Sequence, residues 1–237
     1  MRVSGRTTVC SANRFVARSG AVLVALAALL LSAGSVAGPL GSAAPVLAAE
    51  ASPAQLQPIA LPKPEITGGM PLMQALNARK TTRAFADKPL PLQTLSNLLW
   101  AAFGVNRPRT VMPGLGRTAP SAHNNQEITL ELVLAEGVYI YDAEQNLLRP
   151  VLAGDLRGAI GPAPTAHAAV TIVYVAPVND GFGQVDTGFI GQNVYLFAAS
   201  EGLNAWFYTV HAQDVAAKLG VGADHSVLYA QSVGYPQ

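Results

Sequence analysis

Residues 79–83 bring three cations and two hydroxyls into one short run, Arg79-Lys80-Thr81-Thr82-Arg83, which we call the cationic segment. Guanidinium groups bind phosphate oxygens through two parallel hydrogen bonds, and neighbouring hydroxyls add directed donors. The run therefore has the groups that bind a phosphate monoester. A solvated helix end, whose cations complement the helix dipole, explains the same residues, and this run alone favours that simpler interpretation.

Polar side chains also gather in residues 121–126, Ser-Ala-His-Asn-Asn-Gln, which we call the amide loop. Asn and Gln side chains both donate and accept hydrogen bonds. Such groups suit the edge of a heterocycle that carries carbonyls and ring nitrogens. A polar loop rich in turn-forming residues accounts for the segment equally well.

The order and spacing of these two clusters resemble the FMN-dependent nitroreductase family. In that pattern an Arg-x-Thr-x-Arg segment follows the first helix, and a Pro-Ser-x-x-Asn-x-Gln segment leads into a strand. Residues 202–206 and 233–236 add to the likeness, which covers roughly residues 70–236. Within the family, the chain looks most like the thiazoline- and oxazoline-oxidising dehydrogenases of peptide-toxin biosynthesis, through residues 95–107, 117–121, 137–141 and 186–198.

The resemblance implies an α+β fold with a central, mostly antiparallel sheet flanked by helices. It also implies an FMN-dependent oxidoreductase that carries out two-electron redox chemistry on a small-molecule or peptide substrate. The cofactor performs the hydride chemistry in such enzymes, so no catalytic side chain is assigned. Family members usually form an intertwined homodimer with FMN at the interface, which makes a homodimer the expected assembly.

Four residues of the cationic segment correspond to cofactor ligands of the family. Arg79 and Thr81 match the residues that bind the FMN phosphate, with Lys80 beside them. Arg83 matches the cation at the N1/O2 edge of the flavin, where negative charge accumulates on reduction. A fixed cation at that edge favours the reduced flavin and raises its potential.

The other implied FMN contacts come from later in the chain. Ser121 and Asn124 match the loop that meets the flavin ring and the ribityl chain, and Gln126 belongs to the same loop. Thr209 lies near the point where the family holds backbone groups against flavin N5. The cationic segment and the amide loop are therefore expected to meet around one flavin.

One part of the family pattern is missing from the sequence. Family members commonly carry basic residues after a Gly-x-Pro segment that complete the phosphate site, whereas this sequence reaches Gln237 directly after Pro236. A weaker phosphate contact, or compensation by the partner subunit, is the expected consequence. The alternative hypothesis is an exported, non-catalytic protein that kept the fold and binds a flavin or another ligand.

The N-terminus has the pattern of an export signal. Four arginines and no acid precede an apolar stretch at residues 21–33, which is short for a membrane span. We expect a signal peptide at residues 1–37, with cleavage as late as residue 49, and a periplasmic or secreted protein without a stable membrane span. An exported protein meets little NAD(P)H, so another reductant, or oxygen as the acceptor, is expected.

Hydrophobic periodicity predicts the elements that must position the two clusters. Residues 38–69 are rich in Ala and Pro and suit a linker, so the folded domain is expected at residues 70–237. Helices and strands mix without strict βαβ alternation, which favours an α+β fold. The predicted helices are residues 71–78, 92–103, 189–201 and 213–219; the predicted strands are residues 128–134, 138–141, 147–152, 168–176, 205–210 and 227–233; residues 105–124 are predicted to be a long loop.

Composition narrows the classes of function. Half of the 237 residues are hydrophobic and 12% are charged, with a net charge of +1, so the chain can bury a large core but lacks the basic stripe of a nucleic-acid binder. No nucleic-acid partner is expected. Cys10 is the single cysteine and the four histidines show no i,i+4 pairing, so neither an intramolecular disulfide nor a metal site is predicted.

Overall fold

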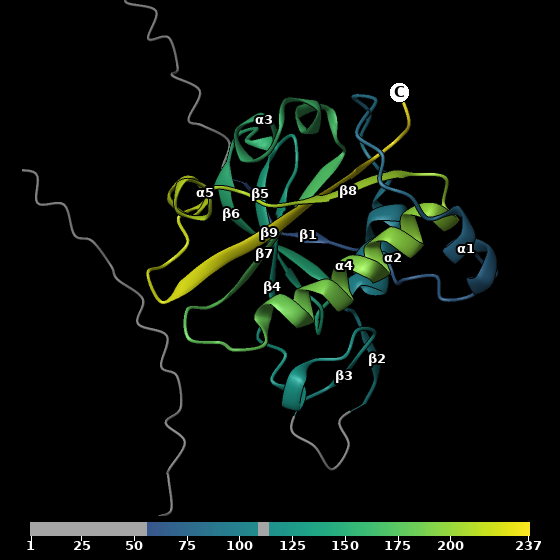
Figure 1. Cartoon of the computed structure of the whole chain (residues 1–237), viewed down its shortest axis with the longest axis horizontal. Coiled ribbons are helices and arrows are strands. Elements are labelled where there is room, and N and C mark those ends of the chain that lie inside the picture. The colour runs from purple at the N-terminus through teal and green to yellow at the C-terminus, as the bar shows by residue number, and fades with distance from the viewer. Residues whose placement is uncertain (1–55, 109–113) are drawn as a thin grey trace, which may run out of the picture. The chain divides into compact units, whose positions relative to one another are not determined.

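The computed structural model describes residues 56–108 and 114–237, which form a seven-stranded sheet with helices packed against it (Figure 1). The strand order is β1-β6-β5-β4-β7-β9-β8, and every neighbouring pair in it is antiparallel. This confirms the α+β fold with a central antiparallel sheet. The strands are β1 (Ile59–Ala60), β4 (Thr129–Val133), β5 (Gly137–Asp142), β6 (Leu147–Ala153), β7 (Val170–Pro177), β8 (Asn204–Tyr208) and β9 (His225–Gly234).

The helices mostly follow the sequence pattern. The first two and the last predicted helices are confirmed to within a residue, and the predicted strands to within two residues. Two short helices before β7 had no signal in the sequence pattern. The helices are α1 (Leu72–Ala78), α2 (Leu92–Phe103), α3 (Arg157–Ile160), α4 (Gly183–Ser200) and α5 (Ala212–Leu219), with 3₁₀ turns η1 (Ala122–Asn124) and η2 (Ala163–His167).

The start of α4 was predicted too late. The helix begins at Gly183 rather than at Phe189. Three glycines at positions 183, 188 and 191 weaken the intrinsic helix propensity of this stretch. Asp186 and Thr187, in the part that the pattern missed, are buried, and this tertiary packing outweighs the propensity.

The central strand β7 has apolar side chains on both faces, which is why it reads as a continuous apolar run. Ile172 and Tyr174 belong to the core that α2 and α4 cover. Val173 and Val175 point to the other face and pack in a second core with α5 and the end of α3. Both predicted clusters are hydrogen-bonded to α4, the amide loop at Asp186 and the cationic segment at Tyr195.

The predicted long loop at residues 105–124 contains regular structure that the sequence pattern did not indicate. Within its described part, β2 (Val105–Arg107) pairs antiparallel with β3 (Gly116–Arg117). The Trp100 indole N–H donates to the carbonyl of Val105 at 3.0 Å, and the Thr118 hydroxyl donates to the carbonyl of Trp100 at 2.9 Å. These bonds tie the small ribbon to the end of α2.

Residues 56–69 lie inside the segment whose composition suits a linker, yet they pack on the sheet. Strand β1 pairs with β6 at the sheet edge, with Ile59 opposite Leu148. Leu61 is buried, and the Asn146 side-chain amide donates to the carbonyl of Pro62 at 2.8 Å. The described part of this segment therefore belongs to the folded unit. The predicted signal peptide, residues 1–37, lies outside the described residues.

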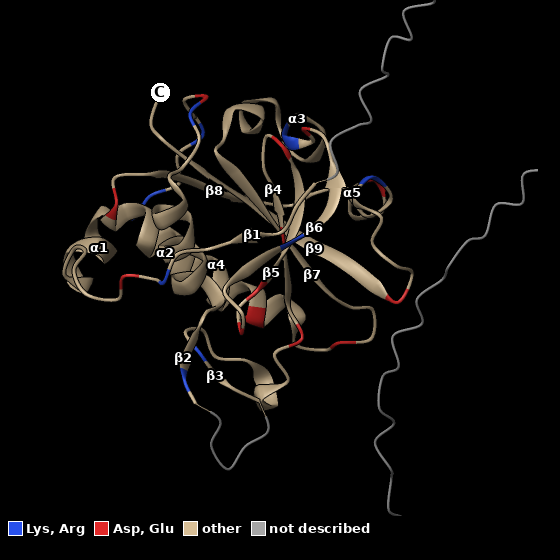
Figure 2. Ribbon diagram, turned by 180° about the vertical axis from the view of Figure 1, so that it is seen from behind, with Lys and Arg blue, Asp and Glu red and all other residues tan. Residues whose placement is uncertain are grey.

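Charged side chains are distributed over the described part of the chain. Figure 2 shows Lys and Arg at several separate places rather than along one stripe.

Among the described helices, none combines the length and the apolar character that a membrane crossing requires.

Candidate functional site

The cationic segment begins where α1 ends and runs beside β8. The Thr82 backbone N–H donates to the carbonyl of Ala205 at 3.0 Å, and the Ala205 N–H donates to the Thr82 hydroxyl at 3.1 Å. The guanidinium of Arg83 lies over the Trp206 ring, 5.2 Å from its centroid. The segment is thus held against β8 through Thr82 and Arg83.

Tyr195, on α4, contacts the first residues of the segment, Arg79 and Thr81. Its hydroxyl lies 2.9 Å from the Thr81 hydroxyl and accepts a hydrogen bond from the Phe207 backbone N–H at 2.8 Å. The Arg79 guanidinium lies over the Tyr195 ring at 5.3 Å. Tyr195 was not among the site residues predicted from the sequence, because an aromatic residue in a helix carries no signal of its own.

The cations of this segment are available to an anion. Arg79 is half-buried, whereas Lys80 and Arg83 are exposed. None of the three lies within ion-pair distance of a carboxylate in the described residues. A cavity of about 360 Å³ beside them is lined in part by Lys80, Thr82 and Tyr195. Three unpaired cations and a fixed hydroxyl make a suitable donor set for a phosphate group.

The amide loop has a strained backbone that its own side chains hold. His123, Asn124 and Gln126 have φ values of 53°, 56° and 53°, in the left-handed region that non-glycine residues rarely adopt. The Gln126 backbone N–H donates to the Ser121 hydroxyl at 2.8 Å, and the Gln126 side-chain amide donates to Asn124 Oδ1 at 2.9 Å. Such strain persists only where the surroundings fix the conformation, and it is common at ligand sites.

Arg117 holds this loop through the side chain of Gln126. Its Nε donates to Gln126 Oε1 at 2.7 Å, and its Nη1 donates to the carbonyl of Phe103 at 3.2 Å. The guanidinium also lies over the Phe103 ring at 5.0 Å, and burial lowers the pKa of Arg117. Both ends of the Gln126 side-chain amide are therefore occupied within the chain, so Gln126 shapes the loop from inside.

The amide loop is anchored to the beginning of α4. The Ala122 backbone N–H donates to Asp186 Oδ2 at 2.9 Å, and Asp186 is 1% exposed. The Ser121 hydroxyl donates to Glu127 at 3.2 Å. Burial raises the pKa of Glu127, and the neighbouring Asp186 carboxyl raises it further. A buried acid, Asp186, and a half-buried one, Glu127, thus lie against the loop.

Within one chain the two clusters do not meet. The amide loop is bound to Asp186 and the cationic segment to Tyr195, and these residues stand nine positions apart on α4. At 1.5 Å per residue they are about 13 Å apart along the helix. Thr209 is exposed just beyond β8 and lines a separate cavity of about 340 Å³. A single chain therefore presents the predicted ligands in separate places, at the two ends of α4 and beyond β8.

Residues 56–108 and 114–237 contain no group of three or more His, Cys, Asp or Glu side chains that could hold a metal ion.

We expect Arg117→Ala to loosen the amide loop. Removing the guanidinium leaves Gln126 Oε1 without its charged donor, which should cost the loop about 1.5 kcal/mol of local stability. Backbone amide exchange in residues 121–126 should therefore accelerate roughly tenfold. Hydrogen–deuterium exchange measures this directly. Arg149→Ala, which breaks an ion pair with Asp142 on the neighbouring strands, serves as the control and should leave the loop unchanged. Equal exchange in both variants would contradict this role of Arg117.

Comparison with known proteins connects this geometry to a family. Residues 76–235 match the Nitroreductase family. A nitroreductase-type protein of Methanocaldococcus jannaschii is 30% identical over 151 residues, which cover 56% of this chain and 75% of that protein. The crystal structure of a nitroreductase-type protein of Ralstonia eutropha is 34% identical and superposes with a TM-score of 0.67, over 76% of this chain and 90% of the other.

A more distant nitroreductase-type structure, from Anabaena variabilis, shares the fold at 21% identity with a TM-score of 0.59, over 70% of this chain and 38% of the other. The matched range contains the cationic segment, the amide loop and all seven strands except β1. The chain belongs to the nitroreductase family, whose members are oxidoreductases.

Proposed function

We propose that this protein is an FMN-dependent oxidoreductase that carries out two-electron redox chemistry on a small-molecule or peptide substrate. The observation that carries the proposal is the cationic segment, whose cations are unpaired in the described chain while its hydroxyls are held by Tyr195 and β8. A helix end that served only solubility would not require this fixation.

The residues present fit FMN. Arg79, Lys80 and Thr81 would hold the phosphate, because this short segment offers two charges and a hydroxyl that Tyr195 holds. Arg83, over the Trp206 ring on β8, would lie at the edge of the flavin that gains negative charge. When bound, the flavin supplies the redox chemistry. The protein then contributes orientation, a cation at that edge, and the exclusion of water.

We further propose that the working unit is a homodimer and that the amide loop reaches the flavin from the partner subunit. A two-fold axis near the middle of α4 would bring the start of one α4 toward the end of the other. The separation of the two clusters within one chain supports this arrangement. The outer face of α4 is suited to such a contact, because Phe182, Val185 and Phe189 are about half exposed in the described chain.

The finer assignments are proposals on the same basis. The likeness of residues 95–107 and 117–121 to thiazoline- and oxazoline-oxidising dehydrogenases supports a heterocycle in a peptide as one substrate class. The N-terminal pattern supports export to the periplasm or the exterior. A protein there would use a reductant other than NAD(P)H, or would pass electrons to oxygen.

The direct test is FMN binding by the purified protein. We expect flavin absorption bands that remain after gel filtration, one FMN for each chain, and a mass by light scattering that corresponds to a dimer. Reduction by dithionite and reoxidation by an added acceptor would show turnover. No retained FMN would refute the proposal, whereas retained FMN that no donor and acceptor can cycle would favour the non-catalytic alternative.

Arg83→Ala is expected to lower the reduction potential of bound FMN by tens of millivolts. A nearby cation stabilises the reduced flavin, and one tenfold change in the equilibrium corresponds to about 30 mV for two electrons. Binding should weaken less than in Arg79→Ala, since the phosphate contacts remain. Spectroelectrochemical titration measures the potential, and an unchanged value would remove this role from Arg83.

A further inference from the structure

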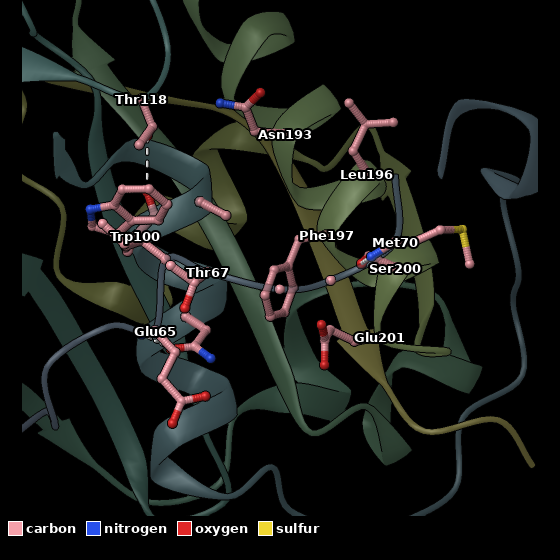
Figure 3. A pocket seen from close by; sticks show the side chains of 15 residues that line it. Glu65, Thr67, Met70, Trp100, Thr118, Asn193, Leu196, Phe197, Ser200 and Glu201 are labelled. Atoms are coloured by element: carbon pink, nitrogen blue, oxygen red, sulfur yellow. Dashed lines mark hydrogen bonds between the residues drawn. The ribbon is translucent and has the colours of Figure 1, made fainter. Parts of the chain in front are cut away.

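A separate pocket is lined by α2, α4 and the segment before α1 (Figure 3). Phe197, which lines it, follows Tyr195 by two residues, and helix geometry turns it by about 200° from that residue. The pocket has a volume of about 550 Å³. Small-molecule sites span roughly 300–1,000 Å³, so this space is large enough for an organic ligand.

Aromatic and aliphatic side chains form part of the pocket wall, beside polar residues such as Asn97 and Asn193. Trp100 from α2 and Phe197 and Leu196 from α4 line it, together with Ile66 from the segment before α1. The Trp100 indole N–H is bound to the Val105 carbonyl at 3.0 Å, so the orientation of the ring is fixed before any ligand arrives. Ile66 is 66% exposed, so part of its apolar side chain is open to a ligand in the pocket.

The charges of the pocket have one sign. Glu65 and Glu201 are the charged residues among those lining it, and Lys and Arg are absent from the lining. Figure 3 shows that they reach the pocket from different segments, Glu65 from the chain before α1 and Glu201 from the end of α4. In the part of the chain that the structure describes, neither carboxylate has an ion-pair partner. The backbone N–H of Glu65 donates a hydrogen bond to the side-chain oxygen of Asn97, which leaves the Glu65 carboxylate itself out of that contact.

We propose that this pocket binds an organic cation with an apolar body, such as a quaternary ammonium group carried on a hydrophobic moiety. Aromatic faces attract cations through their negative quadrupole, and two unpaired carboxylates add Coulomb attraction. The same carboxylates repel a phosphate or carboxylate ligand, so the pocket differs in charge from the cationic segment. It is a second ligand site, and its existence does not depend on flavin binding.

The test uses benzyltrimethylammonium as the probe and benzoate as its anionic counterpart, each titrated into the purified protein by isothermal calorimetry, with and without FMN. We expect saturable binding of the cation, no measurable binding of benzoate at this site, and weaker cation binding as the salt concentration rises. Added FMN should leave the affinity for the cation unchanged.

Substitutions of the lining residues test whether the cation binds in this pocket. Glu65→Gln and Glu201→Gln should each weaken binding of the cation roughly threefold to fivefold, and Phe197→Leu by about the same factor. Glu136→Gln, an exposed acid on the turn between β4 and β5, is the matched control and should bind like the parent protein. The proposal is overturned if the cation does not bind, if benzoate binds equally well, or if Glu65→Gln and Glu201→Gln behave like the control.

Discussion

Arg79→Ala is expected to weaken FMN binding by roughly tenfold to a hundredfold. A charge-assisted hydrogen bond contributes about 1.5–3 kcal/mol, and Arg79 is the half-buried cation of its segment, held over the Tyr195 ring. The loss of flavin fluorescence quenching or of the retained absorption on titration measures the affinity. The fold should be unaffected, because no hydrogen bond of the Arg79 side chain supports it in the described chain.

Arg107→Ala is the matched control for this experiment. Arg107 is an exposed arginine on β2 whose guanidinium bonds to the neighbouring Asn106 at 2.8 Å. Removing it changes the net charge by the same amount without touching the cationic segment. If both variants lose the same small amount of affinity, the effect is one of overall charge, and the assignment of the phosphate to residues 79–81 is wrong.

Glu131→Gln should stabilise the protein by about 2–3 kcal/mol at pH 8. Glu131 lies in β4 and is 7% exposed, and one of its carboxyl oxygens has no hydrogen-bond partner. Burial raises the pKa of Glu131 to about 7, while the charge of His225 opposes this shift. A glutamine occupies the same volume without a charge that must be buried.

The pH dependence of stability has a definite sign. The unfolded chain ionises Glu131 near its usual pKa of about 4.3, whereas the folded chain keeps the proton until about pH 7. Since the folded state holds the proton more tightly, stability is highest below the unfolded pKa and declines by about 3 kcal/mol as the pH rises to about 7, where it levels off.

Urea denaturation at pH 5, 6, 7 and 8 measures both effects. The free energy of unfolding of the parent protein should fall from pH 5 to pH 8 because Glu131 ionises. Glu131→Gln should lack this part of the fall, and at pH 5 its stability should differ little from that of the parent. Glu136→Gln, which removes an exposed acid, should follow the parent curve. A Glu131→Gln curve parallel to the parent curve would mean that the buried carboxyl is not the group responsible.

Local pattern was sufficient for most of the elements. Helix α2 was predicted with both ends correct, because its apolar residues recur at helical spacing between Pro91 and Gly104. Strand β7 was recognisable as an unbroken apolar run. Strand β1 and the ribbon β2–β3 were not, since two- and three-residue strands hold no period that a sequence can reveal and exist only through their partners.

The residue types of the candidate site were readable from the sequence, but their arrangement was not. Arg79, Thr81, Ser121 and Asn124 were selected for their chemistry and for the order in which they occur. Their supports lie far away along the chain: Thr81 meets Tyr195 across 114 residues. Contacts of this range depend on how α4 crosses the sheet, which no local pattern specifies.

The class of fold and the kind of ligand that the polar clusters can bind follow from the sequence alone, because periodicity and donor chemistry are local properties. The separation of the cationic segment and the amide loop by nine positions along α4 became visible in the folded chain. Folding also brought Glu65 and Glu201 to one pocket with Trp100 and Phe197. The packing of helices on a sheet sets such distances, and packing is a property of the whole chain.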